Sequence, residues 1–378
     1  NLTNPGLVSH NEILSMFKEI VDPEFTWHNF SLEEQRKTLA GDRSNNRLDT
    51  TRLESMFPGV KPIRLAVREA LQRYRSSYVP REANPPVGAP RAAIGQLLVT
   101  GGAGFIGSNF INMFCRDNPS VPVINLDALY YCGDAGNVES SIRKSPRYRF
   151  VRLNLQDYDE LVMLTKETRI THVVHFAAQS HVQSSFNDSL SYTQDNVVGT
   201  HNLLEAMRLH NPHLMKFIHV STDEVYGESS YEMDKANVEA ASLLEPTNPY
   251  SATKAGAEML VMAYGRSYGL PYVITRGNNV YGPHQYPEKL IPKFINQLTR
   301  NRPVTLHGDG KNTRNFLFVE DVARAFDRIV HKGQLGHIYN IGGHNEISNV
   351  EVAKELIKIM GLEERSETLI TYVPDRAF

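Results

Sequence analysis

The stretch Leu97-Leu-Val-Thr-Gly-Gly-Ala-Gly-Phe-Ile-Gly107 joins a short apolar run directly to a predicted helix. Its glycines Gly101, Gly104 and Gly107 have the spacing GxxGxxG. In a parallel sheet, the first glycine of such a turn permits a tight bend, the second lets backbone N–H groups approach a pyrophosphate, and the third allows close helix packing. Asp127 follows 20 residues after the last glycine, at the end of the next predicted strand. The stretch therefore predicts a dinucleotide-binding turn rather than a tight turn without a ligand.

This turn begins an alternation of short β-branched runs and longer helical segments. The alternation indicates parallel strands joined by right-handed helical crossovers. We therefore expect an α/β fold, a doubly wound parallel sheet (Rossmann) over residues 97–276, followed by a smaller α/β substrate domain over residues 277–378. The predicted strands span residues 97–100, 122–126, 150–155, 172–176, 217–221 and 272–275, and two later helices lie near residues 319–330 and 349–360.

Composition excludes several classes of protein. The 378 residues carry 40 Lys and Arg against 42 Asp and Glu, without a basic block, so nucleic acid is not an expected partner. The two cysteines, Cys115 and Cys132, cannot form a disulfide framework, and no Cys/His spacing predicts a metal site. No apolar run reaches the roughly 20 residues of a membrane span, and the first residues lack a signal-peptide pattern. We expect a cytoplasmic protein with no membrane partner.

The residues around Asp127 also indicate which dinucleotide binds. Its carboxylate would accept hydrogen bonds from the ribose hydroxyls of an adenosine, and the following Ala128-Leu-Tyr-Tyr offers no cation for a 2′-phosphate. This favours NAD over NADP. Asn154, at the end of the third predicted strand, either contacts the adenine or only forms a turn.

Tyr250 and Lys254 form a second candidate group. They lie four residues apart in NPYSATK, so both project from one face of a predicted helix. A cation beside the phenol, helped by the positive charge of a nicotinamide, favours the phenolate and makes Tyr250 a base toward a sugar hydroxyl near neutral pH. Read alone, the pair is common by chance and would usually mean a solvated helix face; it becomes specific only because it follows the glycine turn at this distance.

The triplet Thr222-Asp223-Glu224 follows an apolar strand. It therefore falls at the carboxyl end of that strand, where open α/β sheets bind ligands. Burial and mutual repulsion can move two adjacent acids to different pKa values, which would give one proton donor and one proton acceptor. A solvated acidic turn is the alternative.

Seven motifs together resemble one known family, in the family's order, over about residues 96–378. They resemble the nucleotide-sugar branch of the extended short-chain dehydrogenases, and within it the dTDP/UDP-glucose 4,6-dehydratases. The Thr-Asp-Glu triplet discriminates, because 4-epimerases and UDP-glucuronate decarboxylases of this fold lack the acid pair. The motifs are TGGAGFIGSN, HFAAQSHV, STDEVYG, NPYSATK, NNVYGPHQYPEKLIP, HGDGKNTRNFLFVEDVARA and YNIGGHNE.

The resemblance implies a redox cycle completed within one active site. Tyr250 takes the proton of the sugar 4-hydroxyl while NAD accepts the C4 hydride, with Thr222 holding the hydroxyl and Lys254 holding the nicotinamide ribose. Glu224 then removes the C5 proton, Asp223 protonates the departing 6-hydroxyl, and the hydride returns to C6. The implied product is a 4-keto-6-deoxy sugar.

The same matching assigns the binding residues. Asn154 departs from the family, which usually has Asp there, and the chain stops where relatives continue, so we expect a truncated substrate domain. The residues expected at NAD are Gly101, Gly104, Phe105, Ile106, Gly107, Asp127, Asn154, Leu155, Ala177, Tyr250, Lys254 and Asn279. The residues expected at the nucleotide sugar are Ser180, Thr222, Asn278, Lys289, Leu290, Arg314, Asn345 and Arg376.

Residues 1–78 resemble a different protein, and a Pro- and Gly-rich linker at 79–96 follows them. This segment has helical patterns at 11–20 and 31–39, and its motifs look like the C-terminal end of a UDP-4-keto-6-deoxyglucose 3,5-epimerase/4-reductase of UDP-rhamnose synthesis. The motifs are NPGLVSHNEIL, FTWHNFSLEEQ and RSNNRLDTTRLESMFPGVKPIRLAVREAL. Either the chain is part of a longer bifunctional polypeptide, which two consecutive pathway steps favour, or the segment now serves packing or interaction.

The combined evidence predicts an NAD-dependent dehydratase acting on UDP-glucose, with dTDP-glucose as the alternative substrate. The family also implies a homodimer formed through two long helices, one of them bearing Tyr250. Two other functions stay open. The chain could be a 4-epimerase or decarboxylase of the same fold, or a non-catalytic scaffold that binds NAD.

Overall fold

The computed structural model describes residues 10–23, 26, 68, 94–227, 237, 239, 242–343 and 346–374. The chain divides into two units, Asn1–Pro90 and Arg91–Phe378, and each is described by itself. In the first unit, α1 (His10–Ile20) corresponds to the helix expected at 11–20 and buries Met16 and Ile20. The helix expected at 31–39 lies outside the described residues.

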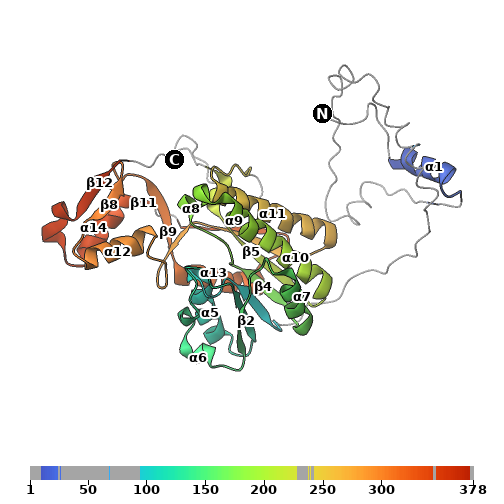
Figure 1. Cartoon of the computed structure of the whole chain (residues 1–378), viewed down its shortest axis with the longest axis horizontal. Helices are drawn as coiled ribbons and strands as arrows, with labels where there is room; N and C mark the ends of the chain where they lie inside the picture. The colour runs from blue at the N-terminus through green and yellow to red at the C-terminus, as the bar shows by residue number, and fades with distance from the viewer. Residues whose placement is uncertain are drawn as a thin grey trace, which may run out of the picture. The chain divides into compact units, whose positions relative to one another are not determined.

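A seven-stranded parallel sheet forms the centre of the second unit (Figure 1). Its spatial order is β10-β6-β5-β4-β1-β2-β3, so the order reverses between β1 and β4, where α/β sheets bind ligands. This confirms the predicted doubly wound sheet. The strands are β1 (Leu97–Thr100), β2 (Val123–Asp127), β3 (Tyr148–Arg152), β4 (His172–His175), β5 (Lys216–Thr222), β6 (Tyr272–Gly277) and β10 (Ile338–Ile341).

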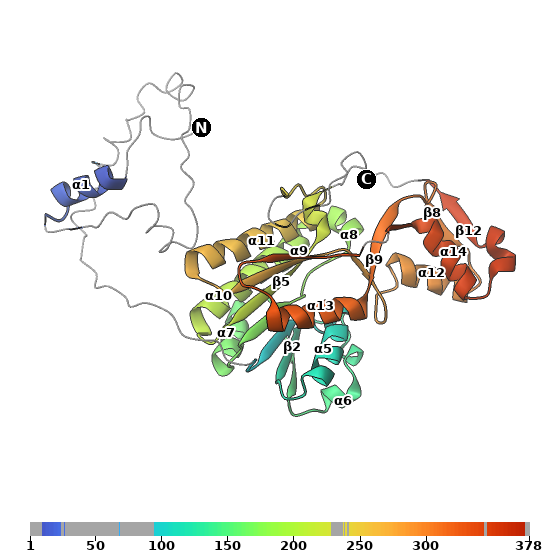
Figure 2. The same ribbon diagram turned by 180° about the vertical axis from the view of Figure 1, so that it is seen from behind.

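Helices cover both faces of this sheet (Figures 1 and 2). One face carries α5 (Phe105–Asp117) and α13 (Val319–Lys332), which pack against each other. The other carries α7 (Tyr158–Glu167), α10 (Gly199–His210) and α11 (Pro249–Tyr268). The shorter helical elements are η2 (Ala135–Asn137), α6 (Ser140–Arg143), α8 (Val182–Asn187), α9 (Ser189–Thr193), the π-helical η3 (Gln194–Val198), η4 (Asp223–Tyr226) and η5 (Glu363–Thr368).

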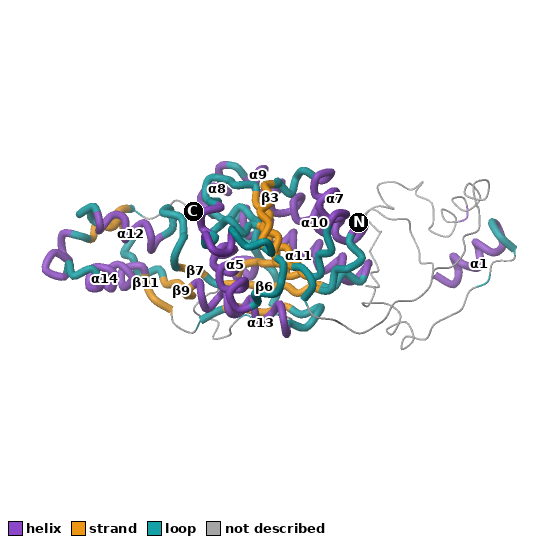
Figure 3. Tube along the Cα trace, turned by 90° about the horizontal axis from the view of Figure 1, so that it is seen from below, coloured by secondary structure: helices purple, strands orange, loops and turns teal. Residues whose placement is uncertain are grey.

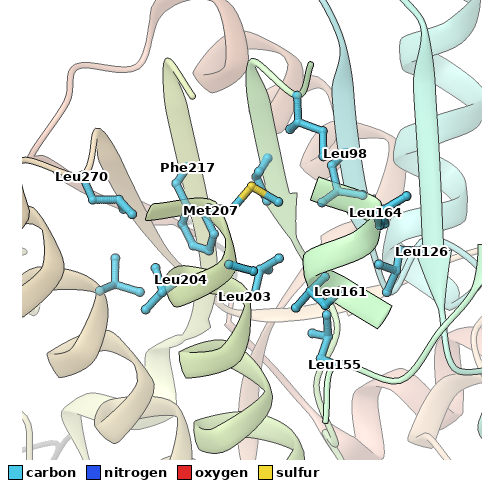
Figure 4. Packing of buried hydrophobic residues seen from close by; sticks show 14 of the residues in the cluster. Leu98, Leu126, Leu155, Leu161, Leu164, Leu203, Leu204, Met207, Phe217 and Leu270 are labelled. Atoms are coloured by element: carbon cyan, nitrogen blue, oxygen red, sulfur yellow. The ribbon is translucent and has the colours of Figure 1, made fainter. Parts of the chain in front are cut away.

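The core follows from the alternation of side chains along each strand. Leu98 and Phe217 point to the α7 and α10 face, whereas their neighbours Val99 and Ile218 belong to the cluster beneath α5 and α13. Figure 4 shows the first cluster, in which strand residues meet leucines of α7 and α10. The two apolar layers fix the strand ends, and with them the residues that follow.

Beyond β6 the chain also builds a smaller part with its own apolar cluster, which lies at one end of this unit (Figure 3). It contains the three-stranded sheet β11-β9-β7 and the two-stranded sheet β12-β8. Its elements are β7 (Asn279–Tyr281), α12 (Leu290–Thr299), β8 (Val304–His307), β9 (Thr313–Phe318), β11 (Glu346–Ser348), α14 (Asn349–Ile359) and β12 (Ile370–Val373).

Two elements depart from the expected division at residue 277. β10 pairs with β6, and α13 packs on α5, so both belong to the large sheet and its helical layer although they follow residue 277. The sequence pattern of a strand or helix does not indicate which sheet it joins. Among the helices of the described residues, none is long and apolar enough to cross a membrane.

Candidate active site

One cavity of about 510 Å³ lies at the carboxyl ends of the central strands. It brings together both acids of the triplet, the Tyr-Lys pair, the glycine turn and Asp127. Arg314, on β9, is not one of its lining residues, and Asn345 and Arg376 lie outside the described residues. The expected residues that line it are Gly101, Gly104, Phe105, Ile106, Gly107, Asp127, Asn154, Leu155, Ala177, Ser180, Thr222, Asp223, Glu224, Tyr250, Lys254, Asn278, Asn279, Lys289 and Leu290.

The glycine turn forms a cradle without side chains between β1 and α5. Gly101 has a φ of +70°, a conformation that favours glycine. A Cβ atom on Gly101 would lie 2.6 Å from the backbone nitrogen of Ala177, and one on Gly107 would lie 2.8 Å from Cα of Gly102. Gly104 caps α5 without a side chain, which leaves the N–H groups of the first helical turn to an anion. These features fit the pyrophosphate of a dinucleotide.

Asp127 ends β2 beside this turn. Its Oδ2 accepts a hydrogen bond from the N–H of Ala103 at 2.9 Å, and its Oδ1 accepts one from the N–H of Leu129 at 2.8 Å. Burial raises the pKa of the Asp127 carboxyl, and the backbone N–H groups partly oppose this shift. Each ionised carboxylate oxygen can accept a second hydrogen bond, so the residue fits the two hydroxyls of a ribose.

The side chain of Asn154 forms a hydrogen bond within its own turn. Its Oδ1 accepts a hydrogen bond from the N–H of Gln156 at 3.0 Å, which is the role of a turn former. Its Nδ2 donates to the hydroxyl of Tyr130 at 2.9 Å, and Tyr130 donates to Asp195 Oδ1 at 3.0 Å. The turn-forming role is therefore present, and an adenine contact stays a prediction.

The two acids after β5 are each held by a different amide. Asn278 Nδ2 donates to Asp223 Oδ2 at 2.6 Å, whereas Asn248 Nδ2 donates to Glu224 Oε2 at 2.9 Å. Thr222 Oγ1 donates to Asp223 Oδ1 at 3.1 Å and accepts the N–H of Glu224 at 3.3 Å. The carboxyl groups are thus fixed separately, as an acid and a base acting on different atoms require.

Both acids have raised pKa values, mainly because they are buried. For Asp223, the hydrogen bond from Asn278 opposes the effect of burial. For Glu224, the charge of Asp223 adds to burial, while Arg314 and Lys289 lower the pKa. We expected the two acids to have different pKa values. Both pKa values are raised, and only that of Glu224 is also lowered by Arg314 and Lys289.

Tyr250 and Lys254 lie in the first turns of α11 and are both buried. Burial, and next the charge of Glu224, raise the pKa of Tyr250, and its hydrogen bond with Thr222 opposes them. Burial lowers the pKa of Lys254 to about 8, and its Nζ donates to the carbonyl oxygen of Val220 at 2.7 Å. The protein's own groups therefore raise the Tyr250 pKa, and the lowering expected with the nicotinamide charge in place stays a prediction.

A buried ion pair joins α11 to the strand β6. Arg276, on β6, contacts Glu258 of α11 with Nη2 2.7 Å from Oε2, and the two side chains are 3% and 0% exposed. The guanidinium carbon also lies 4.7 Å from the ring centroid of Tyr226. Because Glu258 follows Lys254 by one helical turn, the pair fixes α11 against the strand next to the acids.

Sequence reasoning missed several supporting residues. Asn248 forms a capping box at the start of α11, a signal that its place before a proline could have given. Asn196 joins the loop after β4 to α11, because its Nδ2 donates to the Gln179 carbonyl at 3.0 Å and to Thr253 Oγ1 at 2.9 Å. Asn196 lies in a π-helical turn, which periodicity does not reveal. In the described part of the chain, no cluster of three or more His, Cys, Asp or Glu could hold a metal ion.

Comparisons with known proteins agree with this geometry. The sequence profile of the family described as GDP-mannose 4,6 dehydratase matches residues 98–376. The chain is 49% identical over 282 residues to a trifunctional UDP-glucose 4,6-dehydratase/UDP-4-keto-6-deoxy-D-glucose 3,5-epimerase/UDP-4-keto-L-rhamnose-reductase of Arabidopsis thaliana, a match that covers 75% of this chain and 42% of that protein. The chain therefore spans less than half the length of this plant relative.

Two further relatives are covered more completely. The chain is 46% identical over 294 residues to a dTDP-D-glucose 4,6-dehydratase of Homo sapiens, which covers 77% of this chain and 82% of the human protein. The crystal structure of a dTDP-glucose 4,6-dehydratase of Bacillus anthracis in complex with NAD superposes with a TM-score of 0.67 at 41% identity. That match covers 75% of this chain and 85% of the bacterial chain.

Proposed function

This chain belongs to the GDP-mannose 4,6 dehydratase family, and we propose that it converts a nucleoside-diphosphate glucose to the 4-keto-6-deoxy sugar with NAD. The observation that carries the proposal is the pair Asp223 and Glu224, held by separate amides in the same cavity as Tyr250. Eliminating water needs an acid and a base on different atoms, whereas epimerisation at C4 does not.

The glycine turn and Asp127 would hold NAD, with the pyrophosphate at α5 and the ribose at the carboxylate. When bound, NAD accepts the C4 hydride and returns it to C6. Lys254 would hold the nicotinamide ribose once its Nζ turns from the Val220 carbonyl. The positive nicotinamide would then add the field that Tyr250 needs to ionise.

The side chains then divide the proton transfers. Tyr250 accepts the proton of the 4-hydroxyl, which Thr222 holds. Glu224 removes the C5 proton; burial raises its pKa, and the charges of Arg314 and Lys289 partly oppose that rise. Asp223 protonates the departing 6-hydroxyl, and burial supports this role because it favours the protonated acid.

UDP-glucose is the favoured substrate. Residues 1–78 resemble the end of a reductase of UDP-rhamnose synthesis, and the matched Arabidopsis protein carries UDP-glucose dehydratase and reductase activities in its name. We assign the chain to rhamnose synthesis as part of a longer polypeptide in the cytoplasm.

We also propose that the protein forms a homodimer through α10 and α11. The two helices pack side by side, and each leaves a large apolar side chain exposed, Leu209 on α10 and Met259 on α11. Gel filtration of the complete protein tests this, and a monomer rejects it.

Mass spectrometry tests the activity. UDP-glucose and dTDP-glucose are incubated separately with the chain and NAD, and loss of one water from either establishes the dehydratase and chooses the nucleotide. An unchanged mass, with inversion at C4 seen by NMR, would instead support an epimerase. NAD that is never reduced by either sugar would support the scaffold. The double variant Asp223→Asn, Glu224→Gln should lose the dehydration.

A further inference from the structure

The loop between β7 and α12, residues 282–289, is fastened at both ends to segments that border the cavity. We call it the crossing loop. Near its start, Asn109 of α5 donates from Nδ2 to the carbonyl oxygen of Pro283 at 2.9 Å. At its end, Lys289 Nζ donates to the carbonyl oxygen of Ser180 at 3.1 Å. A loop that follows β7 is thus fastened to the segments that follow β1 and β4.

Tyr131 adds a third connection, from the loop after β2. Its hydroxyl donates to Glu288 Oε1 at 2.9 Å, and its ring packs edge-on against Tyr286 with the ring centroids 5.1 Å apart. All three side chains line the same cavity as the glycine turn and Asp127. Tyr131 lies only four residues after Asp127, so this contact ties the crossing loop to the segment that would hold the ribose.

The Tyr131–Glu288 contact also lies next to a residue that acts on the proposed base. Glu288 directly precedes Lys289, whose charge lowers the pKa of Glu224. A hydrogen bond from a phenol to a carboxylate is of the stronger, charge-assisted kind. A single hydrogen bond therefore links the segment that would hold the ribose to the residue next to Lys289.

We propose that Tyr131 and Glu288 are positioning residues that close the crossing loop over the bound dinucleotide and keep the reduced cofactor in place between the two hydride transfers. The proposal rests on the proposed function, because the reaction stops whenever NADH dissociates after the first hydride transfer and before the second. The crossing loop and the glycine turn line the same cavity. We therefore expect a loosened crossing loop to let the dinucleotide leave more easily.

The test uses Tyr131→Phe, Glu288→Gln and the double variant of the full chain. Tyr131→Phe keeps the ring against Tyr286 and removes the donor, whereas Glu288→Gln removes the charge with little change of shape. Release of bound NADH is followed by its fluorescence during a chase with excess NAD, without sugar. We expect release about five- to tenfold faster in each single variant, the size expected for one partly exposed hydrogen bond to a charged group.

The double variant decides whether the two residues share one interaction. We expect it to release NADH no faster than the single variants, because both remove the same bond. Tyr372→Phe is the matched control, since Tyr372 on β12 is 54% exposed against 56% for Tyr131 and lies outside the cavity lining. Its release rate should equal that of the wild type.

Unchanged release in both single variants, or additive acceleration in the double variant, would overturn the proposal. A lowered unfolding temperature that accounts for faster release would do the same, so thermal unfolding is measured on every variant. Release is measured without sugar, so its outcome is separate from the loss of water that tests the proposed function. With UDP-glucose, the single variants should also leave more free NADH per product formed.

Discussion

The buried pair Arg276–Glu258 allows one prediction to be worked out in full. Replacing Glu258 with Met leaves the Arg276 guanidinium, 3% exposed, without its carboxylate partner. Removing one member of a buried ion pair costs about 3–5 kcal/mol, because the remaining charge stays desolvated. The remaining contact with the Tyr226 ring at 4.7 Å offsets part of this cost, so we expect about 3 kcal/mol.

Equilibrium urea unfolding, followed by far-UV circular dichroism, measures the loss. Glu139→Met is the matched control, because Glu139 pairs with Arg116 at 2.8 Å but the two side chains are 43% and 57% exposed. Exposed pairs of this kind contribute up to about 1 kcal/mol. The double variant Glu258→Met, Arg276→Met should recover most of the loss, because it leaves no unpaired charge.

Two results would refute this reasoning. Equal losses for Glu258→Met and Glu139→Met would mean that burial does not set the cost. A double variant that loses the sum of the two single variants would mean that each residue is stabilised by separate contacts rather than by the other.

The remaining predictions concern the acids, Lys254 and the glycine turn. Asp223→Asn and Glu224→Gln should each lower the dehydration rate by at least about a hundredfold, the usual scale for losing a general acid or base, as measured by the loss of water from UDP-glucose; an unchanged rate in either would reject its role. Because the pKa of Lys254 is about 8 in the folded protein and 10.5 when unfolded, the unfolded state binds more protons between these values. The free energy of unfolding should therefore rise with pH in that window by up to about 3 kcal/mol, and urea titrations of Lys254→Met should lack this rise. Gly101→Ala should weaken NAD binding more than tenfold by calorimetry, since the new Cβ meets Ala177, whereas Gly336→Ala, at φ +77° with no atom within 4 Å, should leave binding unchanged.

The sequence by itself determined the features that depend on local spacing. The glycines at 101, 104 and 107, the apolar strand before them and the acid 20 residues later specify a strand, turn and helix. The alternation of strands and helices likewise determined the parallel sheet, because a parallel pair requires a crossover of this length. The Tyr250–Lys254 spacing placed both side chains on one helix face for the same local reason.

Only the tertiary structure decided what depends on distance between segments far apart in the chain. Asn278 reaches Asp223 across 55 residues, and Tyr131 reaches Glu288 across 157. β10 pairs with β6 in the large sheet, a partner that no local pattern of the sequence indicates. The Tyr250 pKa followed burial and the field of Glu224 rather than the nearby lysine, since desolvation and charge act through space and are set by packing.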